Sequence, residues 1–173
     1  MDYQATVEYL QYAYINRLQK FNFLSRAKMF LGQYQLRLDN DSSLIIPEPF
    51  RELLADGAYV TRGFEQNLLI MSAQVFQEIY KRVIALNIAD PLARLLLRLI
   101  LGNASKLDMS NSGQVLIPPQ LTSFAGLEKE INLVGQGDYF EVWAPAHWNK
   151  QSTSLLDVDA NAERFAQLDL ALY

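Results

Sequence analysis

The sequence predicts an α+β fold, built from a duplicated β unit with flanking helices. One short pattern occurs twice, at residues 40–47 and 111–118: a small polar turn, then three apolar residues, then a proline. Serine, asparagine, aspartate and glycine suit the backbone angles of tight turns, and an apolar triplet suits a short buried strand that proline then ends. Apolar residues at helical spacing occur outside the two copies. Together these observations predict two equivalent β units fused in one chain.

The match between the two copies extends beyond the turns. Pro47 and Pro118 lie 71 residues apart. Further along the chain the spacing grows by one residue, which places Gly63 opposite Gly135. Two units of this size indicate a tandem duplication and not a solenoid, because a solenoid needs at least about three repeats to close its core.

The bulk composition limits the class of protein. Half of the 173 residues are hydrophobic, which is enough for one domain, or two small intimate ones, with a real core. The chain has no cysteine, which excludes disulfides and thiolate metal sites. A net charge of −4 argues against a protein coated in basic surface, although it is compatible with a local basic patch. No segment reaches the roughly 18 apolar residues of a transmembrane helix, so no membrane partner is expected.

Residues 1–28 precede the duplicated part. Val7, Leu10, Tyr14 and Leu18 recur at helical spacing, which predicts an N-terminal helical extension. The alternative is that this leader is an appendage without a role in function. Its composition does not match a basic segment followed by an apolar one, so we do not expect a signal peptide.

The first β unit is expected at residues 33–75. Apolar and polar residues alternate along its first strand, and a turn signal separates that strand from the apolar triplet. The predicted elements, in chain order, are a strand at 30–38, a turn at 39–43, a strand at 44–46, a short helix at 49–54 and a hairpin of strands at 59–61 and 68–70.

Two helices are expected to connect the units, over residues 76–102. An apolar stripe at helical spacing predicts the first, from about 73 to 86. Asp90 and Pro91 suit the N-cap and first position of the second helix, which extends to Leu101. Leucines occupy almost its whole circumference, so this helix needs cover on more than one side, and another subunit is the expected source.

The second β unit is expected at residues 104–147. It repeats the first unit, with a short helix at 121–127 and a hairpin of strands at 131–134 and 139–143. The remaining segment, 151–173, is acidic and sparsely apolar. It is compatible with a weak amphipathic helix and equally with a frayed tail.

The sequence offers no set of residues typical of an enzyme. His147 is the only histidine, so a metal site or a nucleophile–base pair would need partners that are not evident. Gly135-Gln136-Gly137 is similar to part of a dinucleotide-binding loop, but it lacks the third glycine and a following helix, and a hairpin turn explains it better. Asp39, Asp41 and Asp108 are explained by turn chemistry more simply than by catalysis. We therefore expect no catalytic or metal-binding residues, no cofactor and no small-molecule substrate.

Two basic residues lie near the turns: Arg37 beside the first and Lys106 near the second. Taken singly, each is best explained as a solvated side chain or a member of a surface ion pair. The functional alternative is that symmetry brings such residues from several copies onto one face, so that phosphate contacts add up across an assembly.

Several motifs resemble the MraZ family over about residues 29–150. They are the duplicated strand–turn–strand unit and the segments Thr61-Arg62-Gly63-Phe64-Glu65, Gly102-Asn103-Ala104-Ser105, Leu133-Val134-Gly135-Gln136 and Phe140-Glu141-Val142-Trp143. The resemblance implies two tandem AbrB-like (SpoVT-AbrB) swapped-hairpin β units that form a pseudo-twofold β-barrel with flanking helices.

The same resemblance implies a function. Family members are transcriptional regulators of the division and cell-wall gene cluster, and they form ring-shaped homo-oligomers. They bind short direct repeats in promoter double-stranded DNA. The resemblance thus implies a cytoplasmic, nucleoid-associated protein whose partners are DNA and further copies of itself.

The family hallmark, an Asp-x-x-x-Arg turn in each repeat, is incomplete in both copies. The first turn keeps Asp39 but has Ser43 in place of arginine, and the second has Ser110 and Gln114 in place of aspartate and arginine. Serine and glutamine carry no charge and cannot replace the arginine fork.

The residues expected to contact DNA follow from this comparison. They are Asp39, Ser43, Ser110 and Gln114 at the turns, with Arg37 and Lys106 as nearby charge. The alternative is an oligomeric scaffold or interaction protein of the same fold, in which specific DNA binding is weakened or lost.

Overall fold

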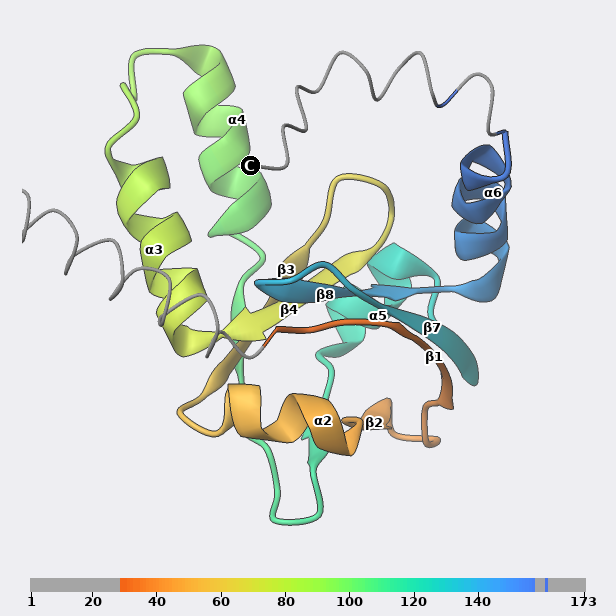
Figure 1. Cartoon of the computed structure of the whole chain (residues 1–173). Helices are drawn as coiled ribbons and strands as arrows, with labels where there is room; N and C mark the ends of the chain where they lie inside the picture. Colours follow the sequence, from red (N-terminus) through yellow and green to blue (C-terminus); the bar gives the residue numbers. More distant parts are fainter. Residues whose placement is uncertain (1–28, 158–160, 162–173) are drawn as a thin grey trace, which may run out of the picture.

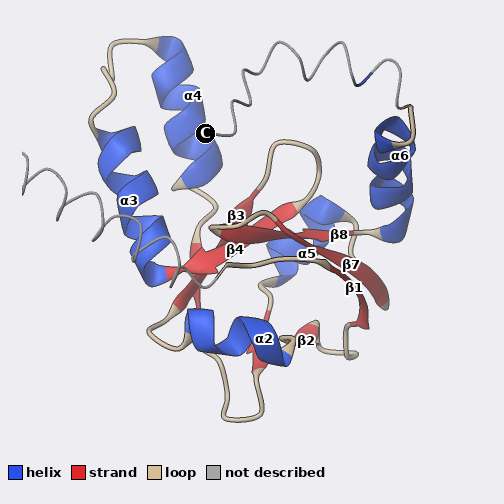
Figure 2. Cartoon of the chain, viewed as in Figure 1, coloured by secondary structure: helices blue, strands red, loops and turns tan. Residues whose placement is uncertain are grey.

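The computed structural model describes residues 29–157 and Asn161 of the chain (Figure 1). Within this part the protein is α+β, with antiparallel sheets and five α-helices, which confirms the predicted class. Figure 2 shows the strands at the centre and the helices around them. None of the described helices is long and apolar enough to cross a membrane. The predicted N-terminal extension and most of the predicted tail lie outside the described residues.

The main sheet has six antiparallel strands in the order β1-β7-β8-β4-β3-β5, and a two-stranded ribbon pairs β2 with β6. The strands are β1 (Gln33–Arg37), β2 (Ser43–Ile45), β3 (Ala58–Arg62), β4 (Leu68–Ser72), β5 (Ser105–Leu107), β6 (Gln114–Leu116), β7 (Glu130–Gly135) and β8 (Tyr139–Trp143). Every predicted strand is present. The strand β5 is an addition that the sequence pattern did not single out.

The strand order is symmetric between the two units. The first unit holds β1 to β4 and the second holds β5 to β8, and exchanging each strand for its counterpart gives the same sheet read from the other edge. Strand β1 pairs with β7, and β5 pairs with β3, so each unit gives its first strand to the other. The two repeats therefore share one sheet.

The hairpins of the two units differ in length by one residue. The first closes with a hydrogen bond from N of Gly63 to O of Asn67, and the second with one from N of Gln136 to O of Tyr139, each 2.8 Å long. Gly63 therefore corresponds to Gln136, and the predicted match to Gly135 is wrong by one residue. The two glycines are not equivalent, because the hydrogen-bond ladder and the loop length, and not residue identity, fix the register of each hairpin.

One hydrophobic core joins the main sheet, the ribbon and the short helices. The inward ribbon residues Leu44 and Val115 are 0 % and 1 % exposed. Phe50, from the short helix after β2, packs against Phe30 and Phe140 with ring centroids 5.0 and 5.1 Å apart, within the usual range of aromatic pairs. The ribbon is thus anchored to the same core as the sheet.

Equivalent short helices follow the two ribbon strands. They are α2 (Glu48–Arg51), continued by a 3-10 turn (Glu52–Leu54), and α5 (Pro119–Ala125). Pro47 and Pro118 precede them with nearly the same backbone angles, φ −53° and ψ 138° against φ −55° and ψ 136°. Both predicted short helices are confirmed, with their bounds shifted by one or two residues.

Longer helices lie at the two ends of the sheet (Figure 1). At one end, α3 (Ala73–Ile84) and α4 (Pro91–Ile100) pack together and connect the units. The N-cap of α4 is Asp90, as predicted, and its carboxylate accepts a hydrogen bond from N of Leu92 (2.8 Å). At the other end, α6 (Pro145–Leu155) continues five residues into the segment predicted as a tail, because no glycine or proline interrupts it.

Candidate nucleic-acid interface

The first polar turn, which we call the first tip (residues 39–43), is closed by backbone hydrogen bonds. The amide of Asp39 donates to O of Ser43 (2.9 Å), and the amide of Ser42 donates to O of Asp39 (3.0 Å). The carboxylate of Asp41 accepts from N of Ser43 (3.2 Å). Ser42 has a φ of +67°, in the left-handed region that favours glycine. This tip therefore stores local backbone strain.

The second tip (residues 110–114) has the same backbone pattern without the strain. The amide of Ser110 donates to O of Gln114, and the amide of Gly113 donates to O of Ser110, both at 2.9 Å. Gly113 has a φ of +81° at the position equivalent to Ser42, which glycine adopts readily. The hydroxyl of Ser110 accepts from N of Gln114 (3.1 Å), so it stabilises the turn from within. The two tips are structurally equivalent.

Strand pairing holds the tips side by side. Directly after β2, Ile46 donates its amide to O of Gly113 (2.8 Å), and directly after β6, Ile117 donates its amide to O of Ser42 (3.2 Å). Each strand thus bonds to the turn of the other repeat. The relative position of the tips is fixed by backbone hydrogen bonds and by the buried side chains below them.

The predicted tip residues do not all face solvent. Asp39 and Ser110 are exposed, and Gln114 is half-buried; Nε2 of Gln114 donates to Oδ2 of Asp39 (3.4 Å). Ser43, expected at an exposed tip, is the first residue of β2 and is buried, with 5 % exposed, although its pairing partner Leu116 is exposed. The structure brings Asp39 and Gln114 together and places the Ser43 side chain below the surface.

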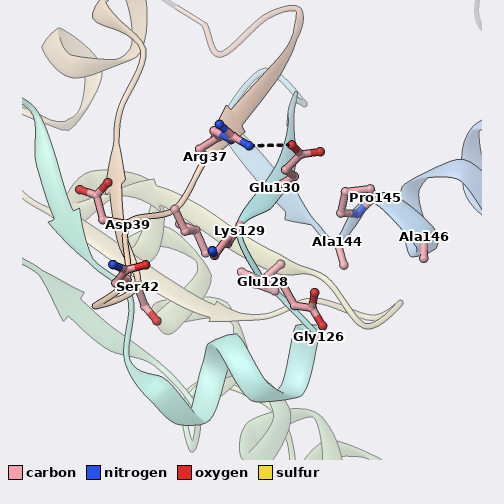
Figure 3. A pocket seen from close by; sticks show the side chains of 13 residues that line it. Arg37, Asp39, Ser42, Gly126, Glu128, Lys129, Glu130, Ala144, Pro145 and Ala146 are labelled. Carbon is pink, nitrogen blue, oxygen red and sulfur yellow. Dashed lines mark hydrogen bonds and ion pairs between the residues drawn. The ribbon is translucent and has the colours of Figure 1, made fainter.

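The predicted basic residues near the tips are both ion-paired. Nη2 of Arg37 lies 3.3 Å from Oε1 of Glu130, and Nζ of Lys106 lies 3.6 Å from Oδ1 of Asp108. Figure 3 marks the Arg37–Glu130 pair with a dashed line. All four side chains are well exposed. Such pairs contribute little to stability, and each carboxylate offsets the positive charge beside it.

A hollow of about 830 Å³ lies beside the first tip (Figure 3). Its charged lining is mixed in sign: Lys129 and Arg37 lie among Asp39, Glu128 and Glu130. A lining of this kind does not favour an anion such as phosphate. The described residues also contain no group of three or more side chains suited to hold a metal ion.

One cation at the second tip was missed by the sequence analysis. Arg51, in α2, donates from Nε to O of Ile46 (2.8 Å), and its side chain lies against Gly113. No pattern near residue 51 connects it to residue 113, because the contact depends on the pairing of β2 with β6.

Comparison with known proteins agrees with the two-unit architecture. The family model for the MraZ protein, whose description adds "antitoxin-like", matches twice, at residues 29–99 and 100–169. Proteins named "Transcriptional regulator MraZ" are similar over most of their length. The one from Herpetosiphon aurantiacus is 37 % identical over 129 residues, which cover 75 % of this chain and 90 % of the relative.

Two further relatives with the same name give similar values. The protein from Thermomicrobium roseum is 34 % identical over 141 residues, which cover 81 % of this chain and 99 % of the relative. The protein from Nitrosospira multiformis is 40 % identical over 132 residues, which cover 74 % of this chain and 90 % of the relative. These names agree with the prediction that the chain is not an enzyme. With both repeats matched and the relatives covered almost end to end, the chain belongs to the MraZ family.

Proposed function

We propose that this chain is a DNA-binding transcriptional regulator of the division and cell-wall gene cluster, which binds short direct repeats in promoter DNA as a ring-shaped homo-oligomer. The observation that carries the proposal is the β2–β6 ribbon, which holds two equivalent polar tips side by side at the surface. Similarity to proteins named as transcriptional regulators supports the same function.

The outward side of the ribbon suits a groove of double-stranded DNA. A two-stranded antiparallel ribbon fits the major groove. Side chains alternate along each strand, so Ile45, Gln114 and Leu116 lie on the side opposite the buried core residues. Ile45 and Leu116 are 53 % and 57 % exposed. Aliphatic side chains can contact the methyl group of thymine, and glutamine can contact adenine with two hydrogen bonds, so this side can read bases.

The assembly is supported by the helical hairpin α3–α4. Six of its large apolar side chains are exposed: Tyr80 (46 %), Ile84 (48 %), Leu86 (38 %), Ile88 (69 %), Leu92 (70 %) and Leu95 (60 %). An apolar surface of this kind is typical of an association site. We infer that another copy covers it, and that a repeated contact of this type closes a ring. A ring presents many tips at once, so weak single contacts with tandem repeats add up.

The finer features of the fold follow the same proposal. We infer that the main sheet and the ribbon together form a pseudo-twofold swapped-hairpin β-barrel, because both line one core and the units exchange strands. The repeats remain at 33–75 and 104–147, with the connector at 76–102. We place the protein in the cytoplasm, associated with the nucleoid, and the proposed function needs no cofactor, metal or small-molecule substrate.

A binding titration tests the proposal. Fluorescence anisotropy is measured with a duplex from the chain's own upstream region and with a random duplex of equal length, at several salt concentrations. The proposal expects tighter binding to the upstream duplex, with a preference that persists as salt is raised. Binding to the upstream duplex that is no tighter than to the random one would contradict it.

A second candidate function is favoured by one specific observation. The hallmark arginines are replaced by Ser43 and Gln114, and the first tip carries two carboxylates, Asp39 and Asp41. The chain would then be an oligomeric scaffold or interaction protein in which specific DNA binding is weakened. This candidate expects light scattering to show the mass of a closed oligomer, and anisotropy to show no preference for the upstream duplex.

A further inference from the structure

Helix α2 of the first repeat places a cation on the tip of the second repeat. Nε of Arg51 donates to O of Ile46 (2.8 Å). A Cβ added to Gly113 would lie 2.7 Å from Cζ and 2.8 Å from Cδ of Arg51, so the guanidinium lies directly against the turn. Figure 1 shows α2 beside the loop that joins β5 and β6. The lack of a side chain at Gly113 leaves the room that Arg51 occupies.

The charge of Arg51 is not offset by an ion pair within the described part of the chain. Ion pairs there involve Arg37, Lys81 and Lys106, but not Arg51. The bond to Ile46 uses one of the five N–H groups of the guanidinium. Arg51 is half-buried, and the bond from Nε to Ile46 fixes its guanidinium beside the turn.

The first tip has no corresponding cation. The residue 71 positions after Arg51 is Thr122, whose hydroxyl donates to O of Pro119 (2.9 Å). The first tip instead carries Asp39 and Asp41, whereas residues 110–114 contain no charged side chain. The two tips therefore share a backbone but differ in charge. The guanidinium of Arg51 makes the second the better place for an anion, although the carboxylate of Asp39 also lies 3.4 Å from Nε2 of Gln114.

We propose that Arg51 is a phosphate-binding residue, which gives the second tip the positive charge lost with the arginine at position 114, so that the second tip makes the stronger contact with a nucleic-acid backbone. The inference rests on the proposed DNA-binding function and names the residue that grips the backbone. An arginine fork stays charged at all relevant pH values and matches the geometry of a phosphate oxygen pair. Because Arg51 and Gly113 come from different repeats, the site exists only in the strand-exchanged fold.

The test compares three variants of the full chain: Arg51→Gln, Arg51→Lys and the control Arg82→Gln. Arg82 is an exposed arginine on α3, away from the tips, so its replacement changes the net charge equally. Anisotropy titrations use the upstream and random duplexes between about 50 and 200 mM salt. For Arg51→Gln the slope of log K against log salt is expected to fall by about one per lost phosphate contact, on both duplexes. Arg82→Gln should keep the parent's slope.

The lysine variant and thermal unfolding separate binding from folding. Arg51→Lys keeps the charge but loses the planar fork and the Nε–H bond to Ile46, so it should retain most of the slope even if it unfolds at a lower temperature. If Arg51→Gln changes the slope no more than Arg82→Gln, or if the lysine variant loses the slope as fully as the glutamine variant, Arg51 is a structural brace and the inference is wrong.

The same data separate this inference from the proposed function. A parent that binds both duplexes equally, with a slope that depends on Arg51, contradicts the specific regulator but supports the phosphate contact. A parent that prefers the upstream duplex, with a slope that does not depend on Arg51, supports the regulator and contradicts the phosphate contact. A parent that binds neither duplex contradicts both.

Discussion

Gln114 and Asp39 face each other across the β2–β6 ribbon, with Nε2 of the glutamine 3.4 Å from Oδ2 of the aspartate. They come from different repeats. Asp39 is the one hallmark aspartate that this chain keeps, and Gln114 occupies the position where the family resemblance implies an arginine. The present hydrogen bond is long and exposed, so its contribution to stability is small. The geometry nevertheless provides a carboxylate that an arginine at position 114 could use.

Gln114→Arg is expected to strengthen DNA binding. The new guanidinium would be oriented by Asp39 through a charge-assisted hydrogen bond, and it would add a second cation to a tip whose only positive charge so far comes from Arg51. Anisotropy titrations should show tighter binding to the upstream duplex and a salt slope steeper by about one unit for each new phosphate contact. Ser43→Arg should increase the affinity less, because Ser43 is only 5 % exposed and neighbouring side chains must move before the longer side chain reaches solvent.

Gln77→Arg is the matched control for this gain. Gln77 is exposed on α3, far along the chain from both tips, and its replacement adds the same charge. The control should raise affinity less than Gln114→Arg does. If the tip variant binds no tighter than the parent, the missing arginines do not explain weak binding, and the account of the chain as a scaffold that lost DNA reading fails.

Ser42→Gly is expected to stabilise the fold. Ser42 adopts a φ of +67°, which costs an L-residue about 1 kcal/mol. Glycine removes this cost, but it raises the conformational entropy of the unfolded chain, which offsets part of the gain. The net gain in the free energy of unfolding should be roughly 0.5 kcal/mol, measured by urea denaturation. Ser112→Gly, in the second tip, relieves no such strain and should be neutral or destabilising. Equal effects of the two substitutions would show that Ser42 is not strained.

The sequence predicts the local elements of this fold well. Turn residues, the apolar triplets and the prolines at 47 and 118 mark the ribbon strands and the short helices after them, because these signals act between neighbours in the chain. The N-cap at Asp90 is confirmed for the same reason. A duplicated pattern also predicts equivalent units, and the equivalent φ values at residues 42 and 113 show that equivalence in atomic detail.

Contacts between the repeats could not be predicted in the same way. The approach of Gln114 to Asp39, and of Arg51 to Gly113, depends on which strands exchange and in which register. The residue pattern of a single strand does not specify which strand of the other repeat it pairs with or in which register. The burial of Ser43 was missed because the turn ends one residue earlier than the apolar triplet suggests, so Ser43 already pairs within β2.

Tyr139 should add a pH dependence to stability at alkaline pH. Burial raises the pKa of Tyr139 above its ordinary value, and the nearby carboxylates of Glu141, Asp138 and Glu65 raise it further. The folded protein therefore holds the phenol proton more tightly than the unfolded chain does, so this stabilisation is present below a pH of about 10 and is lost as pH rises through the folded pKa. In urea denaturation between pH 8 and 11, Tyr139→Phe should lose less stability on alkalinisation than the parent. An identical loss in both would contradict the assignment.

Leu92→Gln combined with Leu95→Gln is expected to disrupt the assembly and leave the subunit folded. Both leucines are on α4 and expose 70 % and 60 % of their surface, so their replacement removes apolar area from the proposed contact without opening the core. Light scattering should report a smaller mass than for the parent, while circular dichroism and the unfolding transition of the subunit stay close to the parent's. DNA binding should weaken as well, because fewer tips then act together.

The control for this change is Leu156→Gln. Leu156 is 79 % exposed just after α6, at the other end of the sheet from α4, so it tests whether any exposed leucine matters. The mass of this variant should equal the parent's. If the α4 variant also keeps the parent's mass, the α3–α4 surface does not hold the ring together. The tips of one subunit would then bind DNA without the gain in affinity that several linked contacts in a ring provide. The affinity of a single subunit would have to account for all DNA binding.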